Sequence, residues 1–190
     1  MAKSTTKAKP KVSPGTGQET PNPMQEIILE KVVLNIGAGQ AGERLNKASR
    51  VLEMLTEHKP VLTTSKKTVR DFNIRKGLQI GAKVTLRGKD AEEFLKRAFY
   101  ARDYKIQHYS FDKQGNAYFG IPDYTEFEGM KYDPEIGIYG MDVAIVIRRR
   151  GGYRLARRKI GTKSLPSRIR VSKEDSMKFL AEKFNVQVIR

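Results

Sequence analysis

Three glycines after an apolar segment are the first residues whose spacing could support chemistry. Residues 32–36 (VVLNI) resemble a strand, Gly37, Gly39 and Gly42 follow as Gly-x-Gly-x-x-Gly, and a helical pattern comes next. In a dinucleotide-binding turn, this order holds the pyrophosphate, and an acidic residue about 20 positions later holds the ribose. Residues 60–65 end without such an acid, and 190 residues leave no room for a substrate domain. A nucleotide-dependent oxidoreductase is therefore a disfavoured alternative.

A phosphate of RNA is the second ligand that the glycine segment could take. Glycines after a strand let main-chain N–H groups and the start of the next helix approach any phosphate. Asn35, at the end of the same strand, offers an amide donor and an acceptor to a base or a ribose. The simpler alternative, that these glycines only form a flexible turn, stays open.

The distribution of charge points to a polyanionic partner. The formal net charge is +16 at pH 7, and residues 148–170 hold ten lysines and arginines without one acid. Residues 59–89 hold nine basic residues and one acid, Asp71. Like charge concentrated in this way destabilises a compact protein unless an anion neutralises it. Nucleic acid is the favoured partner, a solvated basic surface is the alternative, and a membrane is disfavoured because neither block coincides with an amphipathic basic helix.

Residues 63–88 (TTSKKTVRDFNIRKGLQIGAKVTLRG) have the composition of a surface for phosphates and sugars. Lysines, arginines and hydroxyls supply charge and hydrogen bonds: Thr63, Lys66, Lys67, Lys83, Thr85 and Arg87. Gly81 removes bulk where a backbone could lie close. Phe72 and Ile74, in the loop between two expected strands, either stack on RNA or anchor the loop to the core.

No other residues form a convincing catalytic or metal site. The chain has no cysteine, which excludes disulfides and cysteine-ligated metal centres. His58 and His108 each stand alone. The acidic residues of 123–135 lack the spacing of a calcium loop and adjoin no nucleophile. We expect a solvated acidic loop, no metal, no cofactor and no enzyme activity.

The elements that must position these residues follow from hydrophobic periodicity. Strands are expected at 27–36, 61–64, 78–86, 117–121 and 143–147, the last as a central strand. Spacings of three and four predict helices with these inward residues: Leu45, Ala48, Leu52 and Leu55, then Phe94, Leu95, Ala98 and Phe99, then Met177, Leu180, Ala181 and Phe184. Asp90 is expected to cap the second helix, and Ser172 with Asp175 to form a capping box at the third. The fold class is α+β, with a largely antiparallel sheet in one layer, helices packed on one face of it, and the other face free for a ligand.

The chain is expected to be one domain with basic appendages. Residues 1–23 are rich in lysine, threonine, proline and glycine, and we expect a disordered basic tail there. Residues 24–190 are expected to form a single RNA-binding domain in which 148–170 is a basic extension. The sequence shows neither a membrane span nor the apolar segment of a signal peptide, so a soluble, intracellular protein is expected.

Taken together, four segments make the chain similar to a known family. They are VVLNIGAG, LEMLTEHKPVLTTSKKTVRDFNIRKGLQIGAKVTLRG, FDKQGNAYFGI and YGMDVAIVIRRRG, in this order over most of residues 26–152. They resemble the large-subunit ribosomal protein L5 family, which binds 5S rRNA. The stretch RRRGGYRLARRKIGTKSLP resembles the basic extension of the family's archaeal and eukaryotic branch.

The resemblance implies a role for each segment. It implies that 5S rRNA binds Asn35, Gly37, Thr63, Lys66, Lys67, Gln79, Gly81, Lys83, Thr85 and Arg87. The loop of Phe72, Asn73, Ile74, Arg75, Lys76 and Gly77 would approach the peptidyl-site tRNA. Large-subunit rRNA would contact Arg148, Arg149, Arg150, Arg154, Arg157, Arg158, Lys159 and Lys163.

The expected function is that of a non-catalytic structural constituent of the large ribosomal subunit in the cytoplasm. It would attach 5S rRNA to large-subunit rRNA, approach the peptidyl-site tRNA, and touch a small-subunit head protein through an inter-subunit bridge. No small-molecule substrate is expected. The alternative within RNA-binding proteins is a free-standing RNA-recognition module, because QGNAYFGI is similar to an aromatic RNA-binding strand. Such a module exposes two or three aromatic side chains on one sheet face.

Overall fold

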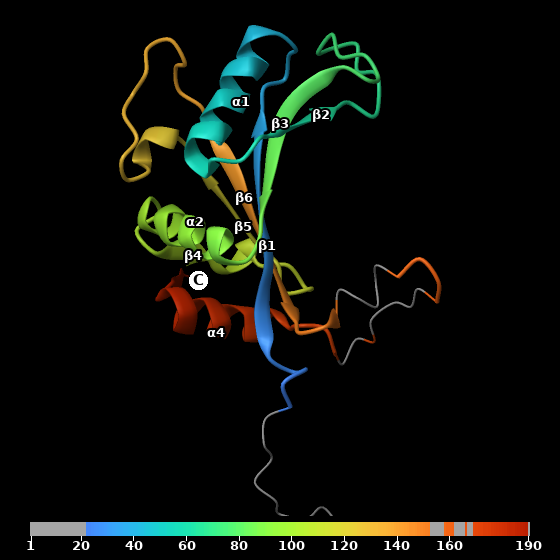
Figure 1. The fold of residues 1–190 in the computed structure, drawn as a ribbon, viewed down its shortest axis with the longest axis vertical. Helices are drawn as coiled ribbons and strands as arrows, with labels where there is room; N and C mark the ends of the chain where they lie inside the picture. Colours follow the sequence, from blue (N-terminus) through green and yellow to red (C-terminus); the bar gives the residue numbers. More distant parts are fainter. Residues whose placement is uncertain (1–21, 153–157, 162–165, 167–168, 190) are drawn as a thin grey trace, which may run out of the picture.

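The computed structural model describes residues 22–152, 158–161, 166 and 169–189 (Figure 1). The tail expected at 1–23 lies outside this part apart from its last two residues, and so do Arg154, Arg157 and Lys163. Within the described part, no helix has the length and apolar character that a membrane crossing requires. No group of three or more histidine, aspartate or glutamate side chains in the same part could hold a metal ion.

Five strands form one antiparallel sheet in the order β2-β3-β1-β6-β5. They are β1 (Ile27–Gly37), β2 (Val61–Thr64), β3 (Gln79–Leu86), β5 (Ala117–Ile121) and β6 (Met141–Arg149). In β3, Val84 and Leu86 are buried while Lys83 and Thr85 are exposed, because successive side chains of a strand point to opposite faces. The apolar run expected to be a central strand lies in β6, between β1 and β5.

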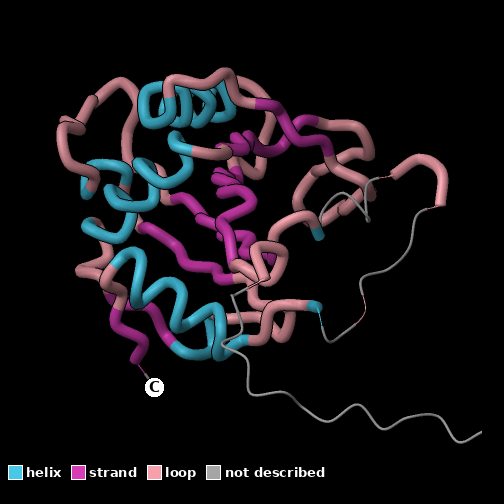
Figure 2. Tube along the Cα trace, turned by 60° about the horizontal axis from the view of Figure 1, so that its bottom comes forward, coloured by secondary structure: helices cyan, strands magenta, loops and turns pink. Residues whose placement is uncertain are grey.

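Among the residues that the structure describes, three helices cover one face of this sheet (Figures 1 and 2). They are α1 (Glu43–Thr56), α2 (Lys89–Tyr100) and α4 (Lys173–Phe184). The inward stripes of α1 and α2 are buried as predicted, and Leu180 and Phe184 of α4 are buried as well. The α+β class, with helices on one face of a largely antiparallel sheet, is confirmed.

The C-terminal segment, from α4 onward, contacts the part of the chain that precedes β5. The prediction for α4 is wrong at one position, since Ala181 is exposed and Ser176 is buried instead. Ser176 Oγ donates a hydrogen bond of 2.8 Å to the carbonyl oxygen of Gly115, in the turn before β5. A second, two-stranded sheet joins β4 (Lys105–Gln107) in parallel to β7 (Gln187–Ile189). Residues after 172 therefore hold the segments on both sides of η1, a short 3-10 turn (His108–Ser110).

The expected caps are met in part. The Ser172 hydroxyl accepts a hydrogen bond from the main-chain N–H of Asp175 at 3.1 Å, which is one half of the predicted box. Asp90 is not the cap of α2, because the helix begins at Lys89 after Gly88 and has no side-chain cap. The Asp90 carboxylate instead lies 3.6 Å from Nε2 of His58.

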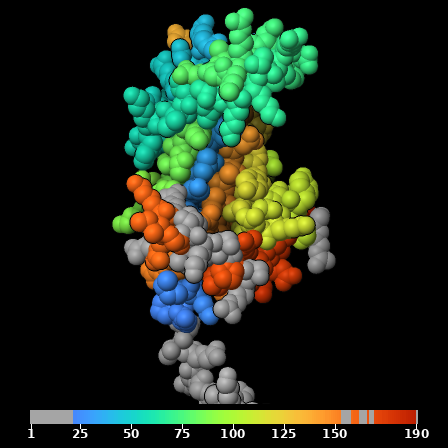
Figure 3. Space-filling model, turned by 90° about the vertical axis from the view of Figure 1, so that its right-hand side faces the viewer, coloured from blue at the N-terminus to red at the C-terminus, as the bar shows by residue number. Residues whose placement is uncertain are grey.

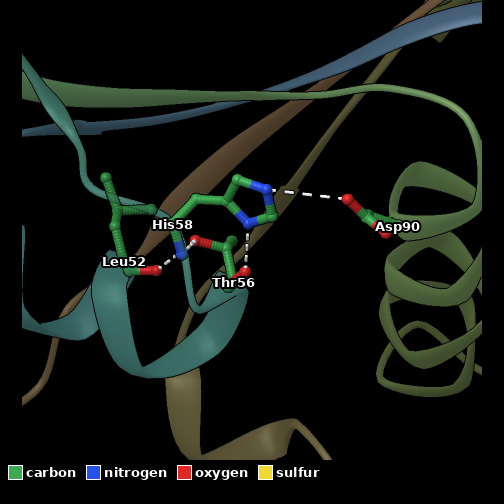
Figure 4. A network of polar contacts seen from close by, with 4 residues as sticks. All are labelled: Leu52, Thr56, His58 and Asp90. Carbon is green, nitrogen blue, oxygen red and sulfur yellow. Dashed lines mark hydrogen bonds and ion pairs between the residues drawn. The ribbon is translucent and has the colours of Figure 1, made fainter.

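His58 connects the end of α1 to the start of α2 (Figure 4). Its Nδ1 lies 2.6 Å from the carbonyl oxygen of Thr56, and its main-chain N–H donates to Thr56 Oγ1 at 3.3 Å. Thr56 Oγ1 in turn donates to the Leu52 carbonyl oxygen at 2.7 Å. This histidine therefore contacts polar groups of both helices.

The acidic loop is less solvated than expected. Tyr124, in the 3-10 turn η2 (Tyr124–Glu126), is 0% exposed, and Phe127 is 2% exposed. The acidic side chains point outward or accept main-chain hydrogen bonds, as Asp123 does from Thr125 at 3.0 Å. The loop is therefore anchored to the core by its aromatic residues, which a reading of its charges alone overlooked.

Candidate RNA-binding surface

The sheet face opposite the helices, called the open face below, collects most residues expected to bind 5S rRNA. Asn35 lies opposite Lys83 of β3 and opposite Asp142 of β6, while Thr63 of β2 lies opposite Gly81. Opposite residues in neighbouring strands point to the same side. Register and alternation thus gather seven predicted residues there: Asn35, Gly37, Thr63, Gln79, Gly81, Lys83 and Thr85. Figure 3 views the molecule from this side, with β1 in blue and β6 in orange.

Three exposed lysines on or beside the open face form no ion pair with the described residues. Lys83 projects from the open face, and Lys66 and Lys67 lie in the loop directly after β2. All three are exposed, and no carboxylate of the described residues forms an ion pair with them. Exposed, unpaired ammonium groups beside hydroxyl and amide side chains are suited to phosphate and sugar contacts.

Arg87 and Arg148 share one carboxylate at the lower end of the open face. Glu30, whose side chain is 6% exposed, lies where the β1–β6 register shifts between Leu29 and Lys31. Its Oε2 lies 2.8 Å from Arg148 Nε, and its Oε1 lies 3.9 Å from Arg87 Nη1. Oε2 has no aligned hydrogen bond, so the contact is a charge pair. Two guanidinium groups against one carboxylate leave a net positive charge, and both arginines stay more than one third exposed.

The last arginine of β6 and the arginine after it also have internal partners. Arg149 Nη2 lies 3.6 Å from Asp175 Oδ2, and Arg150 Nη1 donates to Glu26 Oε2 at 3.0 Å. Arg158 and Lys159 are exposed. Residues 148–170 contain no acid. The sequence of this block therefore did not indicate that its first three arginines pair with acids elsewhere: Glu30 in β1, Glu26 just before β1, and Asp175 in α4.

Two models of known protein families match this chain. The model of the family described as ribosomal protein L5 matches residues 22–75, and a second model, which describes the C-terminus of the same ribosomal family, matches residues 79–185. The chain belongs to the ribosomal protein L5 family. The resemblance inferred from its motifs is thereby confirmed.

Relatives in the family match almost end to end. The large ribosomal subunit protein uL5 of Thermoplasma acidophilum is 68% identical over 169 residues, which cover 89% of this chain and 99% of the relative. The protein of the same name from Picrophilus torridus is 65% identical over 172 residues, covering 90% and 98%. That of Sulfurisphaera tokodaii is 52% identical over 172 residues, covering 90% and 97%.

Membership in the ribosomal protein L5 family removes the enzyme alternative, and the glycine segment agrees. β1 pairs in antiparallel fashion with both β3 and β6, whereas a dinucleotide-binding turn needs a parallel β-α-β unit. The main-chain N–H groups of Ala38 and Gly39 both donate to the Ile80 carbonyl oxygen, at 2.9 and 3.0 Å. These two N–H groups therefore hold the turn against β3, and neither is free for a phosphate.

The aromatic pattern does not match a free-standing RNA-recognition module. Within the described strands, Tyr118 of β5 is the one aromatic side chain on the open face, and Phe119 beside it is 8% exposed and packed in the core. A recognition module of that class stacks bases on two or three aromatic side chains of its sheet. The family and this face together leave that alternative without support.

The loop between β2 and β3 is a small ordered hairpin with an aromatic tip. Val69 and Ile74 exchange main-chain hydrogen bonds of 2.8 and 3.0 Å, and Gly77 N–H donates to the Ser65 carbonyl oxygen at 2.9 Å. Phe72, at the tip, is 71% exposed. Ile74 is partly buried, so it anchors the loop while Phe72 does not.

Glu30 is the residue of this surface that the sequence analysis missed. The signal available was a charged pair, Glu30 and Lys31, within an otherwise apolar strand (IILEKVVLNIG). The pattern of a strand predicts that alternate residues lie on alternate faces. It does not reveal the register shift that places the Glu30 side chain between Arg87 and Arg148.

Proposed function

We propose that the chain is a structural constituent of the large ribosomal subunit that binds 5S rRNA with its open face and so acts in the cytoplasm on the ribosome. The names of its relatives support the assignment to the large subunit. The observation that carries the RNA-binding part is the exposed, unpaired set of lysines beside Asn35, Thr63 and Thr85 on a face that no helix covers.

The proposed mechanism is positional. Lys66, Lys67 and Lys83 neutralise phosphates, while amide and hydroxyl groups of the same face hydrogen-bond to sugars and bases and fix the register of the RNA. Arg87 adds donors to this face, and Glu30 holds it in place together with Arg148, which is expected at large-subunit rRNA. No bond is made or broken in this function.

The remaining contacts are proposed from the family resemblance. The basic extension after β6 binds large-subunit rRNA, and the hairpin tip around Phe72 approaches the peptidyl-site tRNA. A further contact with a small-subunit head protein forms an inter-subunit bridge. The exposed Phe72 and the exposed Arg158 and Lys159 support the first two assignments.

Purification of the tagged full chain from its cells at moderate salt tests the proposal. A stoichiometric RNA of 5S size is expected to accompany it. Lys83→Ala, on the open face, should lower the affinity of the purified chain for 5S rRNA by about tenfold because one phosphate contact is lost. Lys96→Ala, the same change at an exposed position of α2, is the matched control and should leave the affinity unchanged. Equal effects of the two substitutions, or absence of the RNA, would contradict the proposal.

A further inference from the structure

A hollow of about 500 Å³ lies on the β5 side of the open face, away from the unpaired lysines. Strands β5 and β6 form its floor, and the η1 turn forms one wall. Figure 3 shows the yellow-green residues of this region standing beside the orange β6. The hollow is large enough for a planar group the size of a nucleobase.

The floor is open because two small residues lie diagonally on neighbouring strands, Gly120 opposite Asp142 and Ala144 opposite Tyr118. Gly120 of β5 and Ala144 of β6 both line the hollow. A Cβ atom built on Gly120 would meet nothing nearer than Asp142 Oδ1, at 3.7 Å. Close packing therefore does not require this glycine, and its effect is to leave space above the strand.

Two tyrosines with exposed rings border this space. Tyr109 of η1 is 78% exposed and Tyr118 of β5 is 48% exposed, and both line the hollow. Neither ring stacks on another aromatic side chain of the described residues. Exposed aromatic rings are the platforms on which proteins stack unpaired bases.

Asp142 gives the hollow a preference among bases. It is exposed, and no arginine or lysine of the described residues pairs with it, although Arg102 lines the same hollow. An ionised carboxylate only accepts hydrogen bonds and repels phosphate. Guanine alone among the four RNA bases presents two adjacent donors, N1–H and the 2-amino group, on its Watson–Crick edge. The two carboxylate oxygens match that pair of donors.

We propose that this hollow seats one unpaired guanine of a bound RNA, with the base stacked on tyrosine and its Watson–Crick edge against the Asp142 carboxylate. The identity of the RNA rests on the proposed function, whereas the choice of base rests on the hollow. Asp142 is then a specificity-determining residue, and Lys83 with its neighbours supplies affinity that is independent of sequence.

Short oligonucleotides test the hollow without 5S rRNA. The isotope-labelled full chain is titrated with the RNA pentamers UUGUU, UUAUU and UUIUU, where I is inosine, which lacks the 2-amino group. The amide signals of Gly120 and Asp142 are expected to shift most with the guanine pentamer, and Asp142→Ala should abolish this preference. Equal shifts with all three pentamers, or no shift at these amides, would overturn the inference.

A chemical double-mutant cycle tests the same contact within 5S rRNA. Each unpaired guanosine is replaced in turn by inosine, and binding to the wild-type chain and to Asp142→Ala is measured. At one position, inosine should weaken wild-type binding about tenfold, as expected for a lost hydrogen bond to a charged group, and should not weaken binding of Asp142→Ala. Absence of a coupled position overturns the inference but not the proposed function. Failure of 5S binding together with a guanine-specific pentamer shift overturns the proposed function alone.

Discussion

Glu30 shows how a single carboxylate can organise a basic surface. Its nearly buried side chain faces Arg87 and Arg148, so it holds two partly exposed guanidinium groups at the open face and neutralises only part of their charge. The sequence predicts Arg87 as a contact of 5S rRNA and Arg148 as a contact of large-subunit rRNA, yet it could not show which carboxylate these arginines pair with. Ion-pair partners come from residues far apart in the chain, and residue spacing carries no information about them.

Substitution of Glu30 is the prediction at this scale. Glu30→Gln should lower the free energy of unfolding by about 1–2 kcal/mol, because two arginines lose the anion between them. Urea unfolding at low salt measures this change. Glu26→Gln is the matched control, since its pair with Arg150 is about half exposed on both sides and should change stability by no more than about 0.5 kcal/mol. A smaller loss for Glu30→Gln than for Glu26→Gln would show that the shared carboxylate does not stabilise the fold.

At the scale of elements, the period of two in β3 predicted both the strand and its solvent face, and the three helices followed from their apolar stripes. The expectation that Gly81 leaves room for RNA was incomplete, because the glycine is buried. A Cβ atom there would lie 2.9 Å from Thr63 Oγ1 and 3.0 Å from the Ile36 carbonyl oxygen. Such cross-strand crowding depends on register, which a single strand's pattern does not contain.

Substitutions of Gly81 and Gly120 distinguish a glycine that close packing requires from one that it does not. Gly81→Ala should lower the free energy of unfolding by about 1–3 kcal/mol, because the new methyl group overpacks β1 and β2. Gly120→Ala, in β5, should leave it unchanged or raise it by up to about 1 kcal/mol, since its Cβ would make only ordinary van der Waals contacts, the nearest at 3.7 Å. Denaturant unfolding of both variants measures the difference, and an equal loss in both would refute the assignment.

The hairpin between β2 and β3 supplies a second prediction for an element. Phe72→Ala should leave 5S rRNA affinity and the free energy of unfolding within about 0.5 kcal/mol of wild type, because the ring is exposed and away from the open face. Large subunits assembled with this variant should bind peptidyl-site tRNA more weakly. Weakening of 5S binding as large as that of Lys83→Ala would instead place Phe72 in the 5S surface.

For the molecule as a whole, the uneven distribution of its +16 net charge predicts a polyanionic partner, and the sheet has one face that no helix covers, where such a partner would fit. The sequence could not reveal the hollow beside Tyr118, because it forms where β5, β6 and η1 meet. Elements follow from local periodicity, whereas a cavity depends on how several elements pack together.

Salt dependence is the prediction for the whole surface. The logarithm of the affinity for 5S rRNA should fall with the logarithm of salt concentration at a slope of about −3 or steeper, since each phosphate contact contributes about −0.7 to −0.9. Titrations at several potassium concentrations measure the slope, and Lys83→Ala should make it shallower by about one. An affinity that does not respond to salt would contradict phosphate binding by this face.

The contact of Ser176 with Gly115, and the pairing of β4 with β7, set an order of events during synthesis. The turn before β5 is translated about 60 residues before α4, and β4, next to η1, about 80 residues before β7, the elements that hold them in place. A nascent chain can thus complete β1, β2 and β3 early, while the tyrosine-lined end of the sheet waits for residues 173–189 to leave the exit tunnel. The RNA recognition that we propose for that side of the sheet would consequently be a late step in the protein's own biogenesis.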